Sequence, residues 1–92
     1  MRALYFPYDH AHPVAHAIRT GSGWFDAWQF QHGYGDAALA KATGLAPARI
    51  RLLSLGDRVR MSEIDLLAVA YGVQPSDIIA SLPDPDLLQQ DE

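Results

Sequence analysis

The spacing of hydrophobic residues along the 92-residue chain predicts helices and no strands. Apolar residues recur three or four positions apart, which places them on one face of a helix, and no segment alternates convincingly between apolar and polar. Prolines and glycines divide these stretches, because proline suits the first turn of a helix and glycine suits the turn after the last. The pattern predicts helices at residues 13–19, 23–31, 36–43, 47–55, 63–71 and 75–82.

The same pattern predicts how these helices begin, end and pack. Ser22 and Ser62 are the expected N-caps of the second and fifth helices, since a serine side chain can accept a hydrogen bond from a free helix N–H group. Gly44 is expected to take the left-handed conformation that ends the third helix sharply. The expected core residues are Trp24, Phe25, Trp28, Phe30, Leu39, Leu45, Ile50, Leu53, Ile64, Leu67, Ala68, Tyr71, Ile78, Ile79 and Leu82.

Length and composition are typical of one small domain with two distinct ends. A hydrophobic content of 49% is enough for a single core, and residues 1–12 lack a period and are expected to form an irregular arm. The acidic tail at residues 83–92 is expected to be a loose helix or a disordered end. No run of 18 apolar residues is present, so no membrane span is expected and the cytoplasm is the expected location. The absence of cysteine excludes disulfides and thiolate metal sites.

Charge is distributed unevenly along the chain. The formal net charge is −4, which by itself argues against binding to nucleic acid. However, residues 37–62 carry five Lys or Arg side chains against one aspartate, whereas residues 63–92 carry seven acidic side chains and no Lys or Arg. A chain polarised in this way can present a basic surface despite its overall acidity.

The third and fourth predicted helices have the sequence features of a helix-turn-helix. A small residue is needed where two helices cross, a glycine four positions later in the turn, and apolar residues six and nine positions after that glycine. Ala40, Gly44, Ile50 and Leu53 meet these requirements. Residues 39–50, with the later segments 67–73 and 76–78, resemble the Cro and lambda-repressor type, or XRE family, of DNA-binding domains.

This resemblance implies an all-α, lambda-repressor-like bundle of five to six helices at residues 22–82, with residues 1–21 as an N-terminal extension. It implies a homodimeric transcriptional regulator of the repressor kind that binds double-stranded DNA, with a recognition helix at about residues 47–55 in the major groove. No cofactor, metal or catalytic residue is expected. The base-facing residues would be Ala46, Pro47, Ala48, Arg49, Arg51, Leu52 and Leu55, and the phosphate contacts would be Lys41, Arg58 and Arg60.

The residues of the recognition helix themselves leave two interpretations open. A helical projection places Ile50, Leu53 and Ala46 toward the core, with Ala48, Leu52 and Leu55 on the opposite side and the two arginines on its shoulders. Apolar side chains can contact thymine methyl groups while an arginine binds guanine. Alternatively, the apolar strip binds a protein partner, as in an antitoxin-like module. A surface arginine can also be internally paired.

Two further features bear on function. Asp36 begins the third helix, where the family commonly has glutamine beside a phosphate, and a carboxylate there should repel the phosphate. His10, His12 and His16 have a spacing that could supply metal ligands, and a metal-dependent enzyme is the third hypothesis, although no further ligand lies nearby except Asp9. Dimerisation is expected through the aromatic N-terminal segment or through Ile79, Leu82, Leu87 and Leu88.

Overall fold

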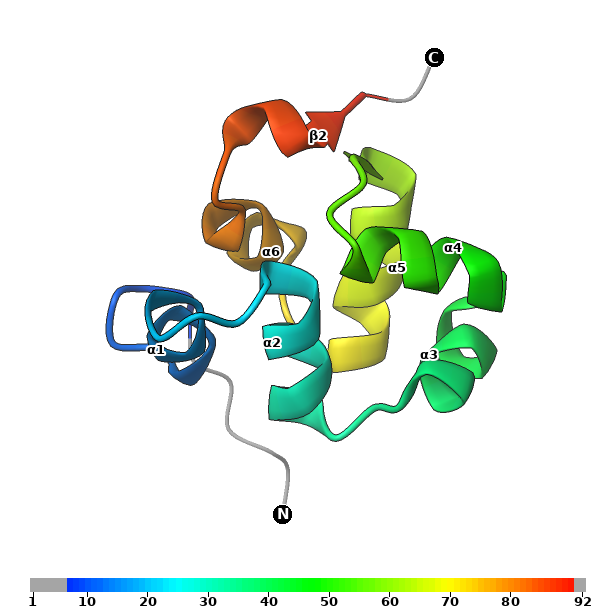
Figure 1. Cartoon of the computed structure of the whole chain (residues 1–92), viewed down its shortest axis with the longest axis horizontal. Coiled ribbons are helices and arrows are strands. Elements are labelled where there is room, and N and C mark those ends of the chain that lie inside the picture. The colour runs from blue at the N-terminus through cyan, green and yellow to red at the C-terminus, as the bar shows by residue number, and fades with distance from the viewer. Residues whose placement is uncertain (1–6, 91–92) are drawn as a thin grey trace.

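Helices account for most of residues 7–90, the part of the chain that the computed structural model describes (Figure 1). The predicted all-α class is confirmed, and the helix boundaries lie within one or two residues of the predicted ones. In chain order the elements are α1 Pro13–Arg19, α2 Trp24–His32, α3 Asp36–Thr43, α4 Pro47–Ser54, β1 Val59–Arg60, α5 Met61–Tyr71, α6 Pro75–Ser81, the short 3-10 helix η1 Pro85–Leu87, and β2 Leu88–Gln89.

Both serine caps were predicted wrongly. Gly23, not Ser22, is the N-cap of α2, and its backbone is extended while the next residue, Trp24, is already buried in the core. Arg60 is the N-cap of α5, so Ser62 lies inside the helix. The free N–H of Arg60 is satisfied by the Glu63 carboxylate at 2.9 Å. A carboxylate in the first turn also interacts favourably with the helix dipole, which explains why no serine cap is needed.

One hydrophobic cluster joins all six helices. Ile50 and Leu53 of α4 and Ile64 and Leu67 of α5 are almost completely buried in it, as their spacing predicts. Helix α3 contacts both α4 and α5, and α2 contacts α4, so α2 and α5 support the α3–α4 pair. The other buried hydrophobic members are Val14, Trp24, Phe25, Ala27, Trp28, Leu39, Val59, Ala68, Tyr71 and Ile78.

Trp28 connects α2 to α5 and α6 within the core. Its side chain is fully buried, its indole N–H donates to the Ser81 hydroxyl at 2.8 Å, and its ring stacks on Tyr71 with centroids 5.8 Å apart. Tyr8, from the segment before α1, lies against the same ring. By contrast, Phe30 is 87% exposed, which corrects its predicted place in the core. Four aromatic residues in one short helix cannot all face the same side, and Phe30 points outward.

The prediction of no strands was wrong at one place. Residues Val59–Arg60 and Leu88–Gln89 form a two-stranded parallel pair in which Val59 lies opposite Leu88. Strands of two residues are too short to show an alternating pattern, so their pairing depends on the tertiary fold. The tail therefore returns to the loop between α4 and α5, at the upper side of Figure 1. Within residues 7–90, no helix has the length and apolar character that a membrane span requires.

Candidate nucleic-acid interface

Helices α3 and α4 are joined by a tight turn that the sequence specifies locally. Gly44 ends α3 with φ of 78°, a conformation that favours glycine, and its N–H donates to the carbonyl of Ala40 at 2.8 Å. The buried Thr43 hydroxyl donates to the carbonyl of Leu39 at 2.7 Å and accepts from the N–H of Leu45 at 3.1 Å. Sequence reasoning overlooked this threonine, although its polar side chain beside the turn glycine was a usable indication. These bonds fix the angle between the two helices.

The outward side of α4 is mostly apolar and carries one free arginine. Ala48, Arg51, Leu52 and Leu55 are all exposed, as the helical projection predicts. Leu55 is 78% exposed and Leu52 47%, and they are two of the five large hydrophobic side chains that are exposed among the described residues. The Arg51 side chain makes no hydrogen bond or ion pair with any described residue. This face therefore offers a guanidinium and several methyl groups to whatever binds it.

The start of α4 differs from the projection. Ala46 is the N-cap of α4 and is exposed, so its predicted orientation toward the core was wrong. An N-cap residue lies half outside the helix, and a helical projection does not apply to it. Pro47, also exposed, occupies the first helical position, where its missing N–H costs nothing.

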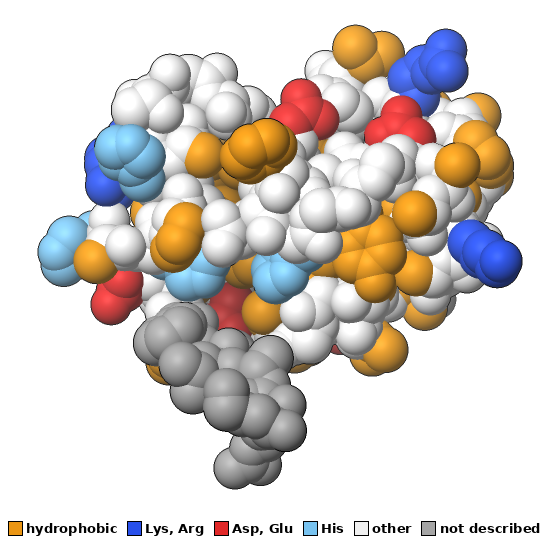
Figure 2. All heavy atoms as spheres, turned by 90° about the horizontal axis from the view of Figure 1, so that it is seen from below, with side chains coloured by type: hydrophobic (Ala, Val, Ile, Leu, Met, Phe, Trp, Pro, Cys, Tyr) orange, Lys and Arg blue, Asp and Glu red, His pale blue; other side chains and the backbone are white. Residues whose placement is uncertain are grey.

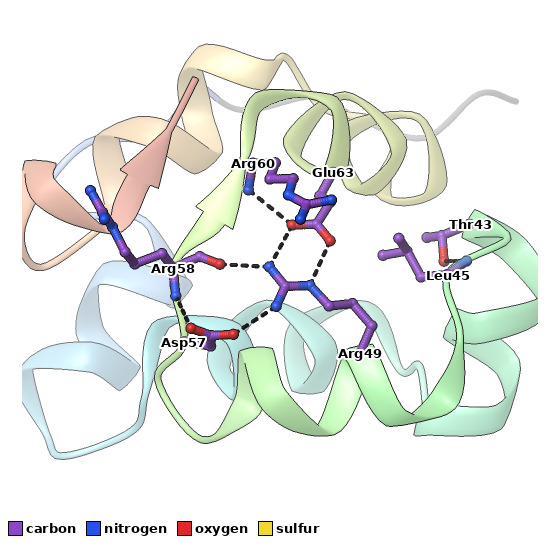
Figure 3. A network of polar contacts seen from close by, with 7 residues as sticks. All are labelled: Thr43, Leu45, Arg49, Asp57, Arg58, Arg60 and Glu63. Carbon is purple, nitrogen blue, oxygen red and sulfur yellow. Dashed lines mark hydrogen bonds and ion pairs between the residues drawn. The ribbon is translucent and has the colours of Figure 1, made fainter. Parts of the chain in front are cut away.

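Arg49 is the largest departure from the predicted site. Its guanidinium forms a bidentate pair with Glu63, with Nε at 2.6 Å from Oε2 and Nη2 at 2.9 Å from Oε1 (Figure 3). Nη1 donates to Asp57 at 2.7 Å, and Nη2 also donates to the carbonyl of Arg58 at 2.6 Å. The guanidinium of Arg49 is therefore paired within the protein, which was the alternative interpretation of a surface arginine, and it does not lie on the outward side of α4. Its donors are committed to the protein, so it cannot also bind guanine with two hydrogen bonds.

The ion pairs around Arg49 shift the pKa values of all three partners. The hydrogen bonds to Glu63 raise the pKa of Arg49 above its usual value. Burial alone would raise the pKa of Glu63, but the hydrogen bonds from Arg49 and from the Arg60 N–H outweigh burial and hold this pKa below its usual range. The pKa of Asp57 is lowered by the hydrogen bond from the Arg58 N–H and then by Arg49. All three groups are therefore charged at neutral pH.

The three predicted phosphate contacts lie on the surface in two places. Lys41 is exposed in the last turn of α3, whereas Arg58 and Arg60 are exposed on either side of the buried Val59, in the loop and strand that follow α4. The Arg58 Nε also donates to the carbonyl of Asp86 in the tail at 3.1 Å. All three cations thus flank the two helices of the predicted helix-turn-helix.

Comparison with known families decides the identity of this arrangement. A family model for the Cro/C1-type HTH DNA-binding domain matches residues 31–84. The chain belongs to this family. No curated protein and no solved structure matches the chain. The match begins in the last turn of α2 and extends past α6, so it contains the whole α3–α4 unit and its supporting helices.

An acidic group occupies the start of α3 in this Cro/C1-type domain. Asp36 is the first residue of the helix and is exposed, and its Oδ1 accepts a hydrogen bond from the Gln29 side chain at 2.8 Å. Gln29 is itself buried, so it fixes the carboxylate at the positive end of the helix dipole. Sequence analysis identified Asp36 but not the glutamine that holds it.

The face of the Cro/C1-type domain seen in Figure 2 differs in character from the outward side of α4. Figure 2 shows histidine and hydrophobic side chains spread over the lower face, with Lys and Arg side chains only toward its edges. The His12 Nδ1 accepts from the Val14 N–H at 3.0 Å, so this histidine caps α1. Residues 7–90 contain no group of three or more side chains that could hold a metal ion.

Proposed function

We propose that this protein is a sequence-specific transcriptional regulator, of the repressor kind, that places α4 in the major groove of double-stranded DNA. The observation that carries this proposal is the outward face of α4, where the Arg51 guanidinium has no partner among the described residues and stands beside exposed apolar side chains. Arginine binds the O6 and N7 of guanine with two hydrogen bonds, and apolar side chains contact thymine methyl groups. The face thus has the chemistry to distinguish base pairs.

Each surface residue then has a distinct role. Arg51 binds a guanine, and the side chains of Ala48, Leu52 and Leu55 contact thymine methyl groups or exclude water beside them. Lys41, Arg58 and Arg60 contact phosphates, which supply affinity but no sequence information. Ala46 and Pro47 bring the start of α4 close to the groove because their side chains are small.

The proposal includes a homodimer, because two recognition helices about 34 Å apart can enter successive major grooves of a palindromic site. Ile79, Leu82, Leu87 and Leu88 are half-buried against the core, so they can supply only their remaining outer surface to such a contact. In the aromatic N-terminal segment, Met1 to Phe6 lie outside the described residues. A dimer of this kind predicts an operator with two symmetric half-sites.

Fluorescence anisotropy with a labelled duplex tests these assignments. The Lys41→Ala variant should bind every DNA sequence more weakly, with a dependence on log salt concentration shallower by about 0.9. The Arg51→Ala variant should retain binding to random sequence but lose preference for its operator, at a cost of about 1–3 kcal/mol. Equal operator preference in wild type and Arg51→Ala would contradict the assigned role of α4.

A second candidate function is a protein-interaction module that uses the strip formed by Ala48, Leu52 and Leu55. The high exposure of Leu55 and Leu52 favours it, since an exposed apolar patch often marks a protein contact. The Leu55→Lys variant separates the two candidates. It should weaken a protein complex sharply, whereas it adds a positive charge and should preserve or increase binding to random duplex DNA.

A further inference from the structure

Arg49 connects the beginning of α4 to the loop that carries two predicted phosphate contacts. An arginine has five N–H donors, and four of them are used here, by Glu63, Asp57 and the carbonyl of Arg58. Glu63 in turn accepts the Arg60 N–H at 2.9 Å, and Asp57 accepts the Arg58 N–H at 2.9 Å. Figure 3 shows this network closing around one guanidinium.

We propose that Arg49 is a positioning residue for DNA binding: by fixing the main chain of residues 57–60, it holds Arg58 and Arg60 in place for the phosphate backbone. This inference rests on the proposed function. Arg49 donates directly to the carbonyl of Arg58. The N–H groups of Arg58 and Arg60 donate to Asp57 and Glu63, the two acids that pair with Arg49. Their orientation relative to α4 is therefore set before DNA arrives, which reduces the entropy lost on binding.

The geometry requires arginine at this position. The planar guanidinium binds both oxygens of Glu63 while its other edge reaches Asp57 and the Arg58 carbonyl, and a lysine ammonium cannot span these groups at once. Glu63 is only 6% exposed, so it depends on this partner for its charge. A lysine would keep the net charge of the protein but release the loop from α4.

The test compares Arg49→Lys with wild type on a random-sequence duplex, with Arg19→Lys on α1 as the matched control. Because the net charge is unchanged, any loss reports positioning. We expect Arg49→Lys to bind about 5- to 10-fold more weakly, with a salt dependence shallower by about one unit, as if one phosphate contact were lost. Amide hydrogen exchange of Arg58 and Arg60 should become faster. Arg19→Lys should match wild type in all three measurements.

A second variant keeps the inference falsifiable if Arg49→Lys does not fold. The pair Arg49→Met with Glu63→Gln removes the partly exposed charge of Arg49 and the buried charge of Glu63. It retains an oxygen for the Arg60 N–H, and it should show the same losses. Wild-type affinity and salt dependence in a folded variant with a lowered melting temperature would overturn the inference, because the network would then only stabilise the fold. If wild type binds no DNA, the proposed function fails instead. In that case amide hydrogen exchange still tests the positioning role: unchanged exchange of Arg58 and Arg60 in the variant would overturn it.

Discussion

Asp36 stands at the N-terminus of α3, where its negative charge has opposite effects on folding and on DNA binding. In the folded protein, the carboxylate lies at the positive end of the helix dipole and accepts the Gln29 hydrogen bond. In the proposed complex with DNA, the same helix end lies beside a phosphate. The Asp36→Asn substitution removes the charge but keeps the Oδ1 acceptor, so it isolates the electrostatic effect from the hydrogen bond.

The size of both effects follows from the position of the side chain. Asp36 is exposed, so its interaction with the dipole is worth about 0.3–1 kcal/mol, and the variant should be less stable by that amount. Two unit charges about 4 Å apart in water repel by about 1 kcal/mol, which corresponds to about a fivefold change in affinity. Asp36→Asn should therefore bind DNA about fivefold more tightly while it melts at a lower temperature.

Fluorescence anisotropy for affinity and circular dichroism for melting measure these opposite changes on one sample. The gain in affinity should shrink as salt rises, because the Debye length falls to about 8 Å at physiological ionic strength. Asp9→Asn is the control, since the Asp9 carboxylate also accepts a hydrogen bond, here from the Ala11 N–H, but lies by α1, on the other side of the molecule (Figure 1). Unchanged or weaker binding by a folded Asp36→Asn protein would refute the placement of a phosphate at this helix end.

Three further predictions concern the scaffold. Burial lowers the pKa of His12, whose neutral Nδ1 caps α1, so the unfolded chain binds a proton more readily than the folded protein does. The melting temperature should therefore fall as pH drops below about 6.5, and it should change less with pH in the His12→Asn variant. Trp28→Phe removes the hydrogen bond to Ser81 and leaves a void, and urea unfolding should show a loss of about 2–4 kcal/mol. Gly44→Ala, at positive φ, should cost about 1–2 kcal/mol, whereas Gly35→Ala, at φ of −78°, should cost almost nothing in the same assay.

The parts of the fold that could be predicted are those that neighbouring residues determine. Gly44 marked the turn because few other residues tolerate its backbone conformation, and Pro47 marked the start of α4 because it fits the first helical turn. Ile50 and Leu53 identified the buried side of α4 by their spacing alone. The helix-turn-helix and its exposed apolar strip were therefore evident from the sequence alone.

The parts that could not be predicted depend on contacts between distant residues. Arg49 and Glu63 are 14 positions apart, and a helical projection places a side chain on a shoulder of the helix without showing which groups lie opposite it. The pairing of Val59 with Leu88 depends in the same way on how the tail returns to the domain. Phe30 could not be separated from the other aromatic residues of α2, because each of them is apolar enough for a core.

Selection of bound duplexes from a random pool, carried out in parallel with wild type and Arg51→Ala, tests the central claim most directly. The claim predicts that wild type enriches a motif with two symmetric half-sites and that Arg51→Ala loses the preference for one guanine in each half-site while the rest of the motif persists. If wild type enriches no sequence at low salt, or if both proteins enrich the same motif, α4 is not the element that recognises DNA in this protein.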